Sequence, residues 1–305
     1  MTERIIALDV GGTSIKAGVC TADLDILPET VASYPSHARE DAETIMRTLA
    51  LVIRDQWQQM PGEDNRLAGI GFGFPGPFDY HKGVSLMNDN VKFDSIYGLP
   101  LGELLTRWAL DDEEIRTLPG FSLRFENDAT VFAYGEYEKG KGRPFRRLAC
   151  VTLGTGCGST FLRDGQMVRG EDGIPADGMI YHRPYLDGTI DDAISKRGIQ
   201  RLAVQFGFPP GSSVREMDVA ARNGDQNAAA LFDAFGKRLG DALAPYLESF
   251  DADGLVLGGN IAKGFPLFEA GMRETIGHRD LPILVSDNLE KSALIGAASL
   301  IVRAG

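Results

Sequence analysis

Cysteine is scarce in this chain. Only three cysteines occur among its 305 residues, and they are Cys20, Cys150 and Cys157. An odd number, with two of the three inside apolar strand-like runs, is not the pattern of a disulfide framework. We therefore expect three reduced, buried thiols, as in a cytoplasmic protein.

Basic charge and long apolar runs are also lacking. The chain carries 31 lysines and arginines against 43 acidic residues, a formal net charge of −12, and no basic block offsets this balance. That charge argues against nucleic acid as a partner. No stretch approaches the roughly 20 apolar residues of a membrane span. A strand begins within a few residues of Met1 with no apolar leader before it, so we expect a cytoplasmic protein without a membrane partner.

Alternating strands and helices are what the chain does have. Apolar residues recur at helical spacing within residues 40–58, and residues 67–74 form a strand-like run that stops at Pro75-Gly76-Pro77. This alternation predicts an α/β fold. A chain of 305 residues is also longer than one hydrophobic core usually supports, so two lobes are expected.

Three predicted strands end in glycine turns. The turns are Asp9-Val10-Gly11-Gly12-Thr13, Leu153-Gly154-Thr155-Gly156 and Leu257-Gly258-Gly259-Asn260. Glycine leaves no Cβ in the path of a ligand, and backbone N–H groups in such turns can converge on an anion. An ordinary hairpin explains each turn taken alone. Three of them spread along the chain suggest one nucleotide held between two lobes.

Two acids stand at strand ends. Asp9 precedes the first glycine turn, where a carboxylate can hold Mg²⁺ through water, although aspartate also starts ordinary turns. Asp128 follows a strand and opens an apolar helix, so it is expected to be a helix N-cap, and a catalytic role is compatible with capping. The helix N-terminus favours the anion and lowers its basicity. Asn127 beside it offers an amide to a substrate hydroxyl.

Five motifs together resemble one family. In chain order they are Asp9-Val10-Gly11-Gly12-Thr13, Gly73-Phe74-Pro75-Gly76-Pro77, Glu126-Asn127-Asp128-Ala129, Leu153-Gly154-Thr155-Gly156-Cys157-Gly158 and Leu257-Gly258-Gly259-Asn260. Their order and spacing are similar to those of the ROK (repressor, open reading frame, kinase) sugar kinases. The resemblance covers nearly the whole chain and implies a two-lobed, actin-like ATPase (ribonuclease-H-like) fold with a central cleft. We place the N-terminal lobe at residues 1–118 and the C-terminal lobe at 119–289, with a helix over 290–305 packing back on the first lobe.

The resemblance also implies a role for each matching residue. Asp128 would be the base that takes the proton from a sugar hydroxyl. The sugar would be bound by Pro75, Gly76, Asn90 and Asn127. The ATP phosphates would face Gly11, Gly12, Thr13, Gly154, Thr155 and Gly156. The adenosine would lie against Gly258 and Gly259, and Asp9 would hold Mg²⁺ through water.

One loop departs from the family pattern. Many ROK members carry a Glu-x-Gly-His segment followed by a Cys-x-Cys-Gly-x-x-Gly-Cys zinc motif. Here no cysteine follows Cys157, so a thiolate zinc site in that loop is excluded and no structural zinc is expected. His182 stands near the family's sugar-binding histidine, whereas Met179 takes the place of the glutamate. Asp177 is a candidate substitute for that glutamate, and both polar residues can instead be ordinary loop residues.

These observations favour an ATP-dependent, Mg²⁺-assisted, glucokinase-like enzyme that phosphorylates a hexose or related sugar. A polyphosphate-dependent glucokinase is an alternative, because the short, zinc-free loop is similar to that of such enzymes; the acidic balance favours ATP. A non-catalytic sugar sensor is a second alternative, but the family's repressors carry a helix-turn-helix before the first hairpin and this strand starts almost at Met1. The resemblance makes a homodimer an expectation, and it leaves the sugar and the hydroxyl open.

Overall fold

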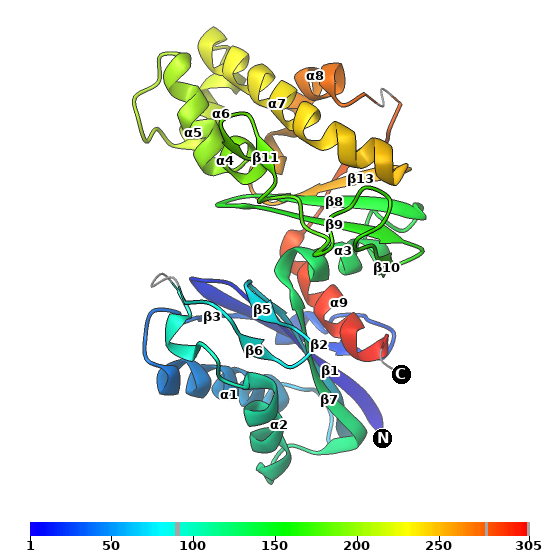
Figure 1. Ribbon diagram of the computed structural model, residues 1–305. Helices are drawn as coiled ribbons and strands as arrows, with labels where there is room; N and C mark the ends of the chain where they lie inside the picture. The colour runs from blue at the N-terminus through cyan, green and yellow to red at the C-terminus, as the bar shows by residue number, and fades with distance from the viewer. Residues whose placement is uncertain (89–91, 278–279, 304–305) are drawn as a thin grey trace. The chain divides into compact units, whose positions relative to one another are not determined.

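Two compact α/β units make up the computed structural model, which describes residues 1–88, 92–277 and 280–303 (Figure 1). Unit 1 consists of Met1–Gly140 and Asn288–Gly305, and unit 2 of Lys141–Asp287. All three cysteines are free and buried, as expected. None of the helices in the described ranges has the length and apolar character needed to cross a membrane.

A five-stranded sheet in the order β3-β2-β1-β4-β7 forms the centre of unit 1. Its strands are β1 (Thr2–Val10), β2 (Ser14–Thr21), β3 (Ala32–Pro35), β4 (Asn65–Phe74) and β7 (Thr117–Asn127). The first three are antiparallel, whereas β4 runs parallel to β1 and β7 runs parallel to β4. The carboxyl ends of β1, β4 and β7 therefore meet at one edge, where Asp9 is the register partner of Gly73 and Phe74 that of Asn127.

Helices cover both faces of this sheet (Figure 1). On one face lie α1 (Ala42–Gln58) and α2 (Leu101–Asp111), and on the other lie α3 (Asp128–Glu138) and α9 (Leu289–Val302). The shorter elements of unit 1 are η1 (Pro28–Thr30), β5 (Phe78–Asp79), β6 (Val84–Ser85) and η2 (Asp94–Ile96).

Alternation along β1 decides which helices Asp9 faces. Ile6 and Leu8 belong to the core that α1 and α2 complete, whereas Ile5 and Ala7 belong to the core that α9 completes. Side chains of a strand alternate between the two faces of the sheet. Asp9 therefore shares a face with α3 and α9.

The glycines of β4 explain how those two helices come so close to the sheet. Gly69, Gly71 and Gly73 alternate with large apolar residues and lie on one face. A Cβ added at Gly71 would overlap the carbonyl of Ala297 in α9, and one added at Gly73 would lie 2.6 Å from Cγ2 of Val131 in α3. The glycines thus admit another backbone, because any side chain there would push α9 away.

Unit 2 repeats the sheet order of unit 1. Its sheet runs β10-β9-β8-β13-β14, with the first three strands antiparallel and the last two added in parallel. These strands are β8 (Arg147–Leu153), β9 (Cys157–Arg163), β10 (Gln166–Met167), β13 (Gly254–Gly258) and β14 (Ile283–Val285). The two units therefore share one sheet topology, and each sheet contains one of the two glycine hairpins.

The helices of unit 2 pack on one face of its sheet (Figure 1). They are α4 (Ile190–Ile194), α5 (Lys196–Gln205), α6 (Val214–Arg222), α7 (Gln226–Phe250), η3 (Ala262–Gly264) and α8 (Phe265–Thr275). A small hairpin of β11 (Pro184–Tyr185) and β12 (Gly188–Thr189) follows the loop that carries Asp177 and His182.

The boundary between the units differs from the one placed at residues 118 and 119. The structure groups β7 and α3 with unit 1 and divides the chain at Gly140. The reason is pairing that the local sequence does not display: β7 extends the unit 1 sheet beside β4, and α3 packs against α9. The C-terminal helix α9 belongs to unit 1 as well.

Candidate active site

The first glycine turn keeps two amides available for an anion. The N–H of Gly11 donates to the carbonyl of Ser14 at 2.9 Å and so closes the turn. The N–H groups of Gly12 and Thr13 have no hydrogen-bond acceptor among the residues the structure describes. Adjacent free amides of this kind form an anion-binding concavity. The turn can therefore receive a phosphate oxygen through Gly12 and Thr13 rather than through Gly11.

Asp9 lies among other charged groups at the end of β1. Burial and, to a smaller extent, the negative charges of Asp128 and Glu290 raise the pKa of its carboxyl to about 7, whereas Lys16 acts in the opposite direction. Lys16 is the register partner of Asp9 across β1 and β2, and its Nζ lies 3.2 Å from Oε1 of Glu290. The carboxylates of Asp9, Asp128 and Glu290 thus lie near a single lysine, Lys16, whose ammonium is ion-paired with Glu290. A divalent cation at Asp9 would relieve this repulsion.

Asp128 is the first residue of α3, and Asn127 is the N-cap. This corrects the expectation that Asp128 itself would cap the helix. The carboxylate still accepts a hydrogen bond from the N–H of Ala129 at 2.9 Å, and the Asn127 side chain accepts from the same N–H at 3.0 Å. The helix N-terminus therefore holds the carboxylate in place.

The pKa of Asp128 is raised, whereas the helix position alone predicts a lower one. Desolvation by the surrounding protein is the largest cause and outweighs the hydrogen bonds from Ala129 and Asn127, which lower the pKa. The side chain keeps solvent-exposed surface, so a substrate can reach the carboxylate. The raised pKa makes Asp128 a better proton acceptor than an ordinary surface aspartate.

Gly73 lies between the two acids. A Cβ at this position would lie 3.5 Å from Oδ1 of Asp9 and 3.8 Å from the Cα of Asp128. Parallel pairing of β1, β4 and β7 produces this arrangement, because it brings the three strand ends to one edge. The structure thus brings together two residues that are more than a hundred positions apart.

Tyr80 connects the candidate sugar-binding residues of unit 1. Its hydroxyl donates to the carbonyl of Phe74 at 3.1 Å and accepts from Nδ2 of Asn127 at 3.2 Å. A Cβ on Gly76 would lie 3.1 Å from the same hydroxyl oxygen. Pro75 and Gly76 therefore lie beside Asn127, whereas Asn90 lies outside the described residues.

The second glycine turn is also closed by an amide of its first glycine, although over a loop one residue shorter than the first. The N–H of Gly154 donates to the carbonyl of Gly156 at 2.9 Å, and the N–H of Cys157 donates to Oδ1 of Asp191 at 2.6 Å. The carbonyl of Gly154 accepts from the N–H of Lys196 at 2.9 Å. These bonds attach the turn to α4 and α5. Within the described ranges, the N–H groups of residues 155 and 156 have no acceptor.

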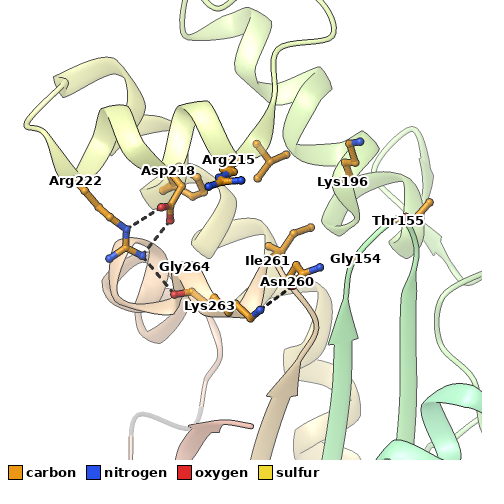
Figure 2. Close-up of a pocket in the computed structure, with 12 residues that line it drawn as sticks. Gly154, Thr155, Lys196, Arg215, Asp218, Arg222, Asn260, Ile261, Lys263 and Gly264 are labelled. Carbon is orange, nitrogen blue, oxygen red and sulfur yellow. Dashed lines mark hydrogen bonds and ion pairs between the residues drawn. The ribbon is translucent and has the colours of Figure 1, made fainter. Parts of the chain in front are cut away.

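A cavity of about 640 Å³ opens beside this turn within unit 2 (Figure 2). Its lining comes from the turn, α5, α6, α7, the end of β13 and η3, and consists of Gly154, Thr155, Lys196, Val214, Arg215, Asp218, Arg222, Phe232, Asn260, Ile261, Lys263 and Gly264. Nε of Arg222 lies 2.8 Å from Oδ2 of Asp218, and Nζ of Lys263 donates to Oδ1 of Asn260 at 2.9 Å. The volume lies in the range of small-molecule sites, and the cationic rim suits an anion.

The third glycine turn packs against the end of β8 and leads into residues that line this cavity. Gly259 has φ of 89°, and a Cβ there would overlap the carbonyl of Leu153. Glycine is required at Gly259 for both reasons. Gly258 and Gly259 do not line the cavity themselves; the next residues along the chain, Asn260 and Ile261, do so.

Asp177 and His182 are neighbours in unit 2. Nε2 of His182 lies 3.5 Å from Oδ2 of Asp177, and the His182 ring packs edge-on against Tyr181 with centroids 4.9 Å apart. Both side chains are exposed. The loop therefore presents an imidazole and a carboxylate side by side, a pair that can hydrogen-bond hydroxyl groups.

Several residues of the candidate site belong to no recognisable sequence motif. Glu290 is distant along the chain, Tyr80 follows the Pro-Gly segment without a motif, and Arg215 and Asp218 belong to a helix whose charges resemble an ordinary solvated face. The spacing of Asp218 and Arg222 matched an i, i+4 ion pair and was the one available signal, but it does not indicate a cavity.

The repeated sheet order defines the class of this protein: it has the actin-like ATPase fold. The ROK hexokinase from Thermus thermophilus has a TM-score of 0.77 to it at 24% identity, covering 99% of this chain and 100% of that chain. A ROK family glucokinase from Streptomyces griseus, crystallised in complex with glucose and AMPPNP, has a TM-score of 0.74 at 23% identity, with 99% and 100% covered. Both are similar in fold.

The sequence model of the ROK family matches residues 5–304. The chain therefore belongs to the ROK family, which confirms the prediction from the five motifs. The glucokinase of Thermotoga maritima is 26% identical over 327 aligned residues, which cover 98% of this chain and 97% of that relative.

Proposed function

We propose that this protein is a sugar kinase that transfers the terminal phosphoryl group of ATP to a hydroxyl of a hexose or a related sugar. One observation carries the proposal: in a member of the ROK family, Asp9 and Asp128 lie together beside a glycine turn with two free amides. Phosphoryl transfer requires a proton acceptor, a cation site and amide donors to phosphate in one place.

Asp128 is the proposed base. Its carboxylate takes the proton of the sugar hydroxyl while that oxygen attacks the terminal phosphorus and the bond to the leaving ADP breaks. The hydrogen bond from Ala129 fixes the carboxylate, and the raised pKa brings its basicity closer to neutral pH. The hydrogen bond supports a fixed orientation of the proton acceptor, and the raised pKa supports its basicity.

Asp9 is the proposed Mg²⁺ residue. When bound, the ion would neutralise negative charge on the phosphates of the donor. The residues fit this ion, since Mg²⁺ is usually held by one or two carboxylates, waters and substrate phosphates, and Asp9 lies in an excess of negative charge next to the amides of Gly12 and Thr13. No group of three or more His, Cys, Asp or Glu side chains in the described part of the chain is placed to hold a metal.

The cavity of unit 2 is the proposed nucleoside site. It adjoins the second glycine turn at Gly154 and Thr155 and has the size that a nucleoside needs. A polyphosphate donor has no base or ribose to place there, so the cavity favours ATP. We assign the sugar to Pro75, Gly76 and Asn127, with Asn90, Asp177 and His182 as further contacts.

A donor and acceptor panel tests the proposal. ATP and polyphosphate are each offered with a set of hexoses; ADP release is followed by a coupled assay for ATP, and sugar phosphate is detected directly for both donors. We expect transfer from ATP. Transfer from polyphosphate but not from ATP would identify polyphosphate as the donor in place of ATP. Sugar binding without transfer from either donor would indicate a sensor. Light scattering of the same sample tests the expected homodimer.

Asp128→Asn tests the assignment of the base. We expect turnover to fall about 10²–10⁴-fold while sugar and AMPPNP still bind, because removing a general base costs roughly that much. Asp111→Asn is the matched control, since Asp111 is an exposed acid at the end of α2. Near-normal turnover in Asp128→Asn would contradict the assignment.

A further inference from the structure

A lysine side chain lies directly over the first glycine turn. A Cβ placed on Gly12 would come within 2.5 Å of Nζ and 2.9 Å of Cε of Lys92. The ammonium and the end of its stem therefore occupy the space that a side chain at Gly12 would take. Gly12 does not have a positive φ; the absence of a Cβ there gives Lys92 room to reach the turn.

The backbone beside Lys92 is firmly held. The N–H of Phe93 donates to the carbonyl of Ala38 at 2.6 Å, and the Phe93 side chain is 1% exposed. Its ring lies 5.2 Å from that of Phe74, the last residue of β4. Packing of Phe93 against the end of β4, just before Pro75, thus fixes the backbone that carries Lys92.

In the part of the chain that the structure describes, no carboxylate is paired with Lys92. Among the residues the structure describes, its Nζ makes no hydrogen bond or ion pair, although the side chain is half-buried. Lys16, the other lysine near this end of the sheet, is already paired with Glu290. A half-buried, unpaired ammonium is costly unless a partner anion arrives.

We propose that Lys92 is a phosphate-binding residue of this enzyme. Its ammonium binds the phosphate group that sits on the amides of Gly12 and Thr13, and it supplies positive charge where Asp9 and Asp128 supply only negative charge. This inference rests on the proposed function, since it assigns the same turn to the phosphates of the donor. A cation and two amides on one phosphate form a stronger site than the turn alone.

Binding experiments on Lys92→Met test the inference without relying on catalysis. Methionine keeps most of the apolar stem and removes the charge. We expect affinity for AMPPNP and for inorganic tripolyphosphate to fall about 10–100-fold, the loss typical of one charge-assisted hydrogen bond, while affinity for adenosine stays unchanged. Lys92→Arg should restore most of the phosphate affinity, and Lys82→Met, at an exposed lysine of unit 1, should have no effect.

The outcomes separate this inference from the proposed function. If wild-type protein transfers phosphate and binds tripolyphosphate but Lys92→Met binds it equally well, the role of Lys92 is refuted. A parallel loss of adenosine and tripolyphosphate affinity, or an equal loss in Lys92→Arg, would also refute it by indicating a structural role. If wild-type protein transfers no phosphate from either donor, the proposed function fails, while selective loss of tripolyphosphate binding in Lys92→Met would still support the phosphate site.

Discussion

Replacing Asp9 by asparagine is expected to stabilise the ligand-free protein, and to do so more at pH 8 than at pH 5. The pKa of the Asp9 carboxyl is raised from 3.8 to about 7, first by burial and then by Asp128 and Glu290. Between pH 3.8 and about pH 7, the Asp9 carboxyl therefore keeps its proton in the folded state but loses it in the unfolded chain. Stability conferred by the protonated form is present at low pH and is lost as the pH rises toward 7.

The magnitude follows from the size of the shift. One pKa unit corresponds to about 1.4 kcal/mol, so between pH 5 and pH 8 the wild-type protein should lose about 3 kcal/mol of unfolding free energy that Asp9→Asn keeps. For a unit of this size that difference corresponds to roughly 6–12 °C in melting temperature. Added Mg²⁺ should narrow the gap by stabilising the ionised carboxylate, and Asp9→Asn should have lost kinase activity.

Denaturant unfolding at several pH values, without nucleotide or metal, is the assay. Asp112→Asn is the matched control: burial raises the pKa of Asp112, but the hydrogen bonds from Arg54 and from two backbone N–H groups, together with the charge of Arg54, outweigh burial and leave the pKa low. A low folded-state pKa gives stability that is complete above the unfolded value, so this control should be destabilised equally at pH 5 and pH 8. If the difference in unfolding free energy between Asp9→Asn and wild type were the same at pH 5 and pH 8, the pKa of Asp9 would not be raised in the folded protein, and the prediction would be refuted.

Two further outcomes are expected. Gly259→Ala should destabilise unit 2 by about 1–3 kcal/mol in denaturant unfolding and weaken AMPPNP binding, because the residue has φ of 89° and a Cβ there would overlap the carbonyl of Leu153; unchanged stability would contradict this. Removing Mg²⁺ with EDTA should abolish phosphoryl transfer in the coupled assay, whereas a zinc-selective chelator should leave folding and activity intact, since no cysteine follows Cys157; stoichiometric, tightly held zinc would refute the second half.

Local sequence determined the parts of this protein that depend on neighbouring residues. The glycines of β4 and the glycine turns at Gly11 and Gly154 are informative in the sequence because a missing Cβ leaves room for another backbone or a ligand. The chain length and the spread of the glycine turns likewise indicated two lobes, and the motifs placed the chain in its family. The role of each matching residue stays a prediction.

Tertiary structure decided what depends on distant residues meeting. The parallel register of β1, β4 and β7 brings Asp9 beside Asp128, and the packing of α9 adds Glu290, so the pKa of Asp9 is set by three segments far apart in the chain. The same applies to the unit boundary after α3 and to Lys92 over Gly12. Burial and charge act through space, over distances that sequence separation does not reveal, and for that reason only the folded chain could show these features.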